Sequence, residues 1–381
     1  MKGVVKGLVR HRFISAVSNR VAEPAPLHDM RGMTSYGTAD EATLRAAMRE
    51  ALPKDTFLPM PKRYGWFVVL QAILWSCLGA MLFAGLPWWA NLLLALVMGH
   101  TLGVQGFLAH EALHGALGGP KWAQHFVGWL GFGPFLVPPT FWTRWHNVAH
   151  HANTNHGDRD PDNFGTVRRY EKNPKARRFL KLAPGSGTWY SYLFLAYSFV
   201  FHAQVVLWFQ TRHRKDFDGF DRRRAIVQSL ACMTVWLAIA ALSGWALVFT
   251  VIIPLVAANV LVQSYILTNH FLRPMSVSNN PVDNSMSLSK PAWLDALQFR
   301  FSHHVEHHLF PTMPSARAPR VRAWLQANVK HRYVCPPHWL ALKLLYATPR
   351  VYADAVTLTD VEQPDRNVNV VALWHAEVSA R

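Results

Sequence analysis

Residues 64–120 read YGWFVVLQAILWSCLGAMLFAGLPWWANLLLALVMGHTLGVQGFLAHEALHGALGGP. This stretch contains no Lys or Arg, and Glu111 is its only charged residue. A second stretch, 225–272, contains no Asp, Glu, Lys or Arg. Because a helix needs about 20 apolar residues to cross a hydrocarbon core of about 30 Å, each stretch has room for two crossings. The sequence therefore predicts two membrane-spanning helical hairpins.

Glycine and proline mark the turn within each stretch. Gly85-Leu86-Pro87 divides the first stretch and Ser243-Gly244 divides the second. The predicted spans are 66–84, 88–108, 225–242 and 245–267. Buried helices of a soluble core are the competing interpretation, but such helices seldom run this long without a charged face.

The positive charge of the chain lies outside these spans. The net charge is +17, and both hairpin turns lack Lys and Arg. The basic residues that flank the spans are Lys62, Arg63, Lys121, Arg222, Arg223, Arg224 and Arg273. The positive-inside rule then puts the turns outside and the rest of the chain in the cytoplasm, where its charge faces anionic lipid. A nucleic-acid partner is not expected, because no recognition motif is present and the basic residues form no single stripe.

A fifth apolar segment, 188–209, is expected to lie in the membrane interface. If it crossed, the Arg222-Arg223-Arg224 run would lie outside, against the positive-inside rule. Its aromatic residues suit the depth of the lipid headgroups. The predicted fold class is therefore an all-α integral membrane protein. It has four transmembrane helices in two hairpins, an interfacial helix and a cytoplasmic helical cap.

Half of the 20 histidines lie in three clusters. Residues three or four apart share one face of a helix, so the spacing within each cluster directs several imidazoles the same way. Imidazole is the commonest protein ligand for metals and suits iron, zinc, copper or nickel. The clusters are His110 and His114; His146, His150 and His151, with His156 five residues on; and His303, His304, His307 and His308. The isolated histidines elsewhere are expected to be packing or surface residues, with His270 as the exception.

Helix length brings the clusters to one side of the membrane. A helix from Trp88 to His114 spans roughly 40 Å, which exceeds the hydrocarbon core by about two turns. His110 and His114 should therefore emerge on the cytoplasmic side, and His270 leaves the fourth span on the same side. The other clusters already lie there. The sequence predicts a single metal centre in the cytoplasmic cap.

These motifs resemble the membrane fatty acid desaturase/hydroxylase superfamily. His110-Glu-Ala-Leu-His114 matches its first histidine box, His146-Asn-Val-Ala-His-His151 its second, and His304-Val-Glu-His-His308 followed by Leu-Phe-Pro its third. The run from His146 to Asn155, with Asp160-Pro-Asp162 after it, is most similar to the front-end and acyl-lipid branch. The resemblance covers roughly 64–319. It implies a desaturase domain over 61–320, between a polar cytoplasmic segment, 1–60, and a cytoplasmic C-terminal segment, 321–381.

The resemblance also implies a cofactor and its ligands. Family members hold two iron ions and use O2, and a ninth histidine after the fourth span corresponds to His270. The implied metal ligands are His110, His114, His146, His150, His151, His270, His304, His307 and His308. The residues expected to support these ligands are Glu111, Glu306, Asn269, Asp160 and Asp162. His156 and His303 are expected to be dispensable or nearly so, because His303 points about 100° away from His304 on a helix.

The implied reaction removes two neighbouring hydrogens from a long acyl chain and leaves a double bond. Hydroxylation, or oxidation of an alkane or carotenoid, is the sister reaction that the boxes do not separate from it. An external electron donor is expected, either a ferredoxin or a cytochrome b5-like protein, because no dinucleotide motif or fused b5-like motif is present. The carrier of the acyl group, its length and the double-bond position stay open.

Two unrelated functions compete with this interpretation. His110-Glu-Ala-Leu-His114 is also the zinc metalloprotease pattern, and Phe217-Asp218-Gly219 offers the downstream Asp-Gly of membrane-embedded versions. That interpretation leaves the other two clusters without a role. A histidine relay in a metal or haem transporter would place its sites near the midplane of the bilayer, where only His100 is deep in a span.

Overall fold

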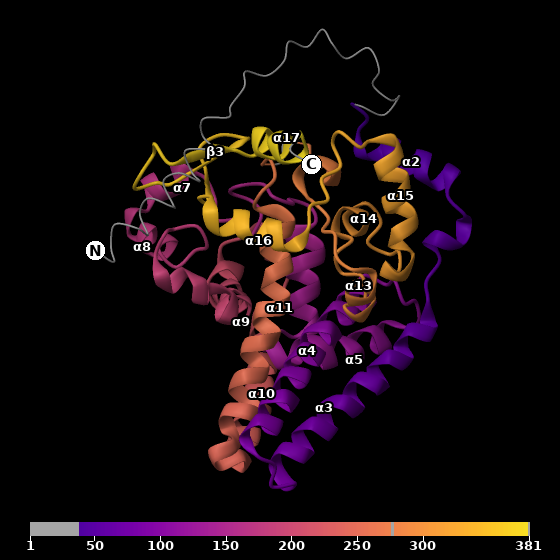
Figure 1. Ribbon diagram of the computed structural model, residues 1–381, viewed down its shortest axis with the longest axis vertical. Helices are drawn as coiled ribbons and strands as arrows, with labels where there is room; N and C mark the ends of the chain where they lie inside the picture. The colour runs from indigo at the N-terminus through magenta and orange to yellow at the C-terminus, as the bar shows by residue number, and fades with distance from the viewer. Residues whose placement is uncertain (1–37, 276–277, 380–381) are drawn as a thin grey trace.

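Two helical hairpins organise the protein, whose computed structural model describes residues 38–275 and 278–379 (Figure 1). The first hairpin consists of α3 (Gly65–Phe83) and α4 (Trp88–Leu113). The second begins with α10 (Arg222–Ser243) and returns through α11 (Ile253–His270). Each of the four predicted helices is therefore present. Most of the polar segment predicted over 1–60 lies outside the described residues, which include only 38–60 of it.

The fourth predicted helix begins irregularly. A 3-10 turn, η10 (Gly244–Ala246), and a π-helical turn, η11 (Val248–Ile252), precede α11. Five helical stretches of the described chain are long and apolar enough to cross a membrane, one more than the four predicted spans. The additional one, Trp189–Arg212, contains the segment expected to lie in the interface. It folds as η7 (Trp189–Leu193) and α9 (Phe194–Trp208).

Close packing against α4 determines where the first histidine cluster lies. A Cβ at Gly99 would lie 2.8 Å from the carbonyl oxygen of Pro254, so the missing side chain lets α4 approach α11. A Cβ at Gly131 of α5 (Lys121–Phe132) would lie 2.7 Å from the carbonyl oxygen of Gln105 on α4. Side chains at these glycines would push the helices apart. The absence of side chains at these glycines therefore allows α5 and α11 to pack closely against α4.

Short helices connect the two hairpins. They are η4 (Gly133–Phe135), α6 (Pro139–Trp142), η5 (Thr143–His150), α7 (Val167–Lys172), η6 (Pro174–Ala176) and α8 (Arg177–Leu180), and, after α9, η8 (Gln210–Arg212) and η9 (Lys215–Phe217). In Figure 1, α7 and α8 lie above α9, and α9 lies beside the upper part of α11. The long helices continue below this level.

The segments before and after the hairpins gather at the upper end of the long helices (Figure 1). Leu44 and Met48 of α2 (Glu41–Ala51) are fully buried with Val305 of α14 (His304–Leu309) and Val321 of α15 (Ala318–Asn328). The remaining helices here are η2 (Lys54–Phe57), η3 (Pro61–Tyr64), α12 (Pro281–Asn284), α13 (Ala292–Leu297), η12 (Ser315–Arg317), α16 (His338–Ala347) and α17 (Val370–Ser379).

A small sheet, not predicted from the sequence, completes this upper part. Strands β1 (Val351–Tyr352), β2 (Thr357–Thr359) and β3 (Asn367–Asn369) pair antiparallel in that order, with Tyr352 opposite Leu358. The Tyr352 hydroxyl donates to the carbonyl oxygen of Arg273 and accepts from the Asn155 amide at 3.0 Å. The sheet therefore fastens the chain after His270 to the chain after the second histidine cluster.

Candidate metal centre

The first histidine pair stands at the end of α4. His110 lies in its last turn and His114 caps it, so the rings face the same way with centroids 4.8 Å apart. The helix is 26 residues long, and its last ten residues are all buried. The predicted extension of this helix to the cluster is confirmed.

The second cluster lies on a π-helix, whereas the spacing of its histidines predicted an α-helix. In η5 the N–H of His151 donates to the carbonyl oxygen of His146 at 3.0 Å, a bond over five residues. The wider turn brings His146 and His151 together, with their Nε2 atoms 3.2 Å apart. His150 is directed toward a different set of histidines. The rings of His146 and His150 nevertheless stack with centroids 5.1 Å apart, so the predicted facing of these two residues is present in the structure.

The third cluster lies on α14, a helix of six residues. His304, His307 and His308 contact histidines of the other clusters, and the Nε2 atom of His304 lies 2.7 Å from that of His270. His303 caps the helix and bonds instead to Asp295 and Glu306. The predicted difference in direction between His303 and His304 is present in the structure.

Long-range packing sorts the imidazoles into two histidine groups, and a third set, His146, His150 and Asp162, links them. Within each group, one nitrogen of every ring lies within 4.8 Å of the others. The first group is His110, His114, His146, His151 and His307, and the second is His150, His270 and His308. His304 joins the second group through its contact with His270. All nine histidines named from the sequence are thus brought to one place.

The chemistry of these rings suits a metal ion. The Nε2 atoms of His114, His307 and His308 are buried and have no hydrogen-bond partner, which is costly unless another ligand satisfies them. Burial, reinforced by the neighbouring imidazoles, holds the pKa of His114, His151 and His307 well below its ordinary value. Neutral imidazole offers the lone pair that a metal needs. The residues present therefore fit two adjacent metal ions.

Comparison with known proteins identifies the family. The sequence profile described as fatty acid desaturase matches residues 87–339, which include all three clusters and His270. The chain belongs to the fatty acid desaturase family. It is an oxidoreductase of lipid metabolism and a membrane-associated protein, as its apolar helices also indicate. Asp218, the residue that a metalloprotease would need, lies in neither histidine group of the described chain.

Sequence identity to individual relatives is low, although some matches extend over most of this chain. The chain is 23% identical over 339 residues to a chloroplastic omega-6 fatty acid desaturase of Spinacia oleracea, with 82% of this chain and 70% of that protein covered. It is 27% identical over 188 residues to an omega-3 fatty acid desaturase of Caenorhabditis elegans, covering 46% and 45%. An acyl-lipid (9-3)-desaturase of Borago officinalis is 22% identical over 282 residues, covering 65% and 62%.

Asp160, a residue named from the sequence as a support of the ligands, contacts His150. Its Oδ1 atom lies 2.9 Å from Nδ1 of His150, and its Oδ2 atom accepts from the N–H of Asn155 at 2.7 Å. Burial alone lowers the pKa of His150, but the charge and hydrogen bond of Asp160, with Asp162, raise it to about 9. Asp162 also bonds to Trp145 and His202. His202 thus has a role that its isolation in the sequence did not indicate.

Replacing Asp160 by Asn should lower turnover and metal occupancy about 10- to 100-fold, because the carboxylate that fixes the His150 ring is lost. The matched control is Asp158→Asn, since the exposed Asp158 bonds only to the hydroxyl of Thr166. Metal analysis and turnover of both purified variants would test this. Wild-type values for Asp160→Asn would contradict the role given to Asp160.

The two glutamates do not contact the grouped histidines, contrary to expectation. Glu111 pairs with Arg63 at 2.7 Å and accepts from the N–H and hydroxyl of Ser315. Glu306 pairs with Arg322 and accepts from the hydroxyls of Ser287 and Tyr333. Each carboxylate ties a histidine-bearing helix to a segment distant in the sequence. The glutamates therefore support the site by joining segments of the fold and not by contacting its histidines. Their pairing with Arg63 and Arg322 could not be predicted from the sequence.

Asn269 and His156 are the remaining candidates. Asn269 is fully buried beside His270, and neither polar atom of its side-chain amide has a hydrogen-bond partner. An unsatisfied amide at this position is available to a further ligand. His156 lies outside both histidine groups of the described chain. Trp142, which no motif singled out, stacks on His146 with ring centroids 4.5 Å apart.

A cavity of about 540 Å³ leads to the histidines. Its inner end is lined by His110, His146, His150, His270 and His304, and thus by members of both groups. Apolar side chains from several segments form most of the remaining wall, among them Phe199 of α9 and Val262 and Ile266 of α11. An apolar cavity with a few polar groups at one end binds a ligand that is mostly hydrocarbon.

Proposed function

We propose that this chain is a membrane fatty acyl desaturase that introduces a double bond into a long acyl chain. The observation that carries the proposal is the apolar cavity that ends on both histidine groups. The substrate class is supported by the relatives, which are named as omega-6, omega-3 and acyl-lipid desaturases. Hydroxylation at the same site is the alternative outcome.

Two iron ions are the proposed cofactor. The first histidine group would hold one ion, and His150, His270, His304 and His308 would hold the other. When bound, iron supplies the redox chemistry that uses O2 and two external electrons. A ferredoxin or a cytochrome b5-like protein is the proposed electron donor.

The protein's own contribution is to position the acyl chain. Phe107 and Phe301 stack at 3.9 Å beside His110 and narrow the inner end of the cavity. An acyl chain held there presents one carbon pair to the metal ligands and excludes water from the site. Placing reacting groups in a fixed geometry lowers the barrier without a charged catalytic side chain. Asp160 holds the proton on Nδ1 of His150 and leaves Nε2 for the metal.

The product formed in cells tests this proposal. Cells expressing the chain with an electron donor should accumulate an acyl chain with one additional double bond, detected by mass spectrometry of total lipids. Ile266→Trp should abolish the product by filling the cavity next to His270. Val260→Trp, on the lipid-exposed side of the same helix, should not. A hydroxylated product would favour the sister reaction, and an unchanged lipid profile would contradict both.

For the topology, we propose that the two hairpins cross the bilayer and that α9 lies in the interface, with the site on the cytoplasmic side. The position of α9 beside only the upper part of α11 supports this arrangement (Figure 1). Accessibility tags at Gly85 and Gly244 should report the outside, and tags within 212–223 and at the C-terminus the inside. An outside signal from 212–223 would mean that the fifth apolar helix crosses.

A further inference from the structure

The outer end of the cavity is rimmed by exposed aromatic rings. Phe179 of α8 is 55% exposed, Phe201 of α9 is 54% exposed, and Phe209 at the end of α9 is 65% exposed. All three line the cavity whose inner end carries the histidines. Exposed phenylalanines at one opening are costly in water and stable against lipid. Such a rim suits contact with lipid chains.

The helices above this rim are strongly basic. Residues 167–181, which form α7, η6 and α8, contain seven Lys and Arg residues and a single acidic residue, Glu171. Among the described residues, only Lys181 of this set forms an ion pair, with Glu362 at 3.7 Å. Arg168, Lys172 and Lys175 are exposed and line neither neighbouring cavity. Most of the positive charge of residues 167–181 is thus not neutralised by acidic residues of the described chain.

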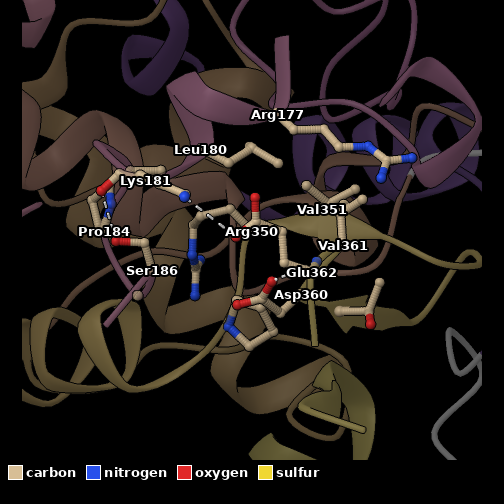
Figure 2. Close-up of a pocket in the computed structure, with 14 residues that line it drawn as sticks. Arg177, Leu180, Lys181, Pro184, Ser186, Arg350, Val351, Asp360, Val361 and Glu362 are labelled. Carbon is tan, nitrogen blue, oxygen red and sulfur yellow. Dashed lines mark hydrogen bonds and ion pairs between the residues drawn. The ribbon is translucent and has the colours of Figure 1, made fainter. Parts of the chain in front are cut away.

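Helix α8 borders both the acyl cavity and a small pocket of about 50 Å³, whose lining includes several charged residues (Figure 2). Leu180 lines both, whereas Arg177 and Lys181 line only the small pocket. Figure 2 shows Lys181 reaching toward Glu362, while Arg177 extends away from it. The cations of α8 do not converge on one point. They spread over a surface, which suits a layer of headgroups better than one enclosed anion.

We propose that residues 167–181 and the aromatic rim dock the enzyme on anionic phospholipid headgroups, and that the acyl substrate is carried by such a lipid. This rests on the proposed desaturase function. The chain would enter past Phe179, Phe201 and Phe209 while the phosphate stays among Arg168, Lys172 and Lys175. Aromatic rings beside basic residues are typical of a membrane surface. An acidic carrier protein would satisfy the charge but would leave the exposed rim in water.

Binding of phosphatidylglycerol to the full-length protein tests the proposal separately from catalysis. The variant R168Q/K172Q/K175Q, termed the rim variant, removes three of the positive charges above the aromatic rim. Its matched control, R49Q/K54Q/K330Q, removes three exposed charges of α2, η2 and the segment after α15, away from α7 and α8 in Figure 1. Fluorescent phosphatidylglycerol and phosphatidylcholine would be titrated against detergent-purified protein. Turnover of the same acyl chain on each lipid would then be measured in nanodiscs.

The rim variant should bind phosphatidylglycerol about 100-fold more weakly, because each of the three basic residues at a lipid surface contributes roughly 1 kcal/mol. The control should bind as the wild type does, and phosphatidylcholine binding should hardly change. Equal phosphatidylglycerol binding by both variants would overturn the proposal, as would binding of an acidic acyl carrier protein that only the rim variant loses. Intact lipid binding without turnover of any acyl chain would instead contradict the desaturase function.

Discussion

The His304→Ala protein is expected to lose all detectable turnover and the metal of one site, while the His303→Ala protein keeps both. The two residues are adjacent in sequence but face different groups. His304 lies 2.7 Å from His270, nitrogen to nitrogen, whereas His303 bonds to the carboxylates of Asp295 and Glu306. Loss of His304 removes a ligand, and loss of His303 removes only a hydrogen-bond partner of the supporting network.

The same expectation extends to the other histidines of the two groups. Each replacement by alanine should abolish product formation, because neither metal is expected to act alone. The positions are His110, His114, His146, His150, His151, His270, His307 and His308. His156→Ala serves as a second control, since this residue lies outside both groups.

Metal analysis and product analysis of the same preparations would test this prediction. Wild-type protein purified from iron-replete cells should contain about two irons per chain, with one ion held by each histidine group. Full activity and full iron content in His270→Ala would remove His270 from the site. An inactive His303→Ala beside an active His304→Ala would mean that the third cluster is misread by one residue. Activity with zinc and no iron would end the di-iron proposal.

The Glu306→Gln protein is expected to be destabilised by about 3–5 kcal/mol, because a buried ion pair loses one partner. Glu306 has no exposed surface, and its carboxylate lies 2.9 Å from the Nε atom of Arg322. The pKa of Glu306 is lowered because Arg322 and the hydrogen bonds from His303 and Ser287 together outweigh the effect of burial. A neutral amide would leave the partly buried Arg322 without its counter-charge.

Thermal unfolding in detergent would test this, with Glu362→Gln as the matched control. Glu362 also pairs with a basic residue, Lys181, but both side chains are about half exposed. An exposed pair contributes about 0–1 kcal/mol, so the control should unfold near the wild-type temperature. Similar unfolding temperatures for the two variants would show that the Glu306 network does not stabilise α14.

The amino-acid sequence by itself determined where the long helices lie and indicated which histidines gather at one place. The absence of charge over 64–120 and 225–272 is a property of the chain alone, and it predicted helices that are present in the structure. The spacing within each cluster and the family resemblance selected nine histidines, all of which meet at one place. These features depend on neighbours in sequence, so they could be predicted.

Tertiary structure alone decided how the nine histidines divide. The π-helical turn of η5 pairs His146 with His151, and Asp160 turns His150 toward His270 and His308. Those two histidines come from segments more than a hundred residues further along the chain. The partners of Glu111 and Glu306, the sheet and the cavity depend on the same long-range packing. Sequence spacing describes one helix at a time, whereas a metal site and its access route are formed where several helices meet.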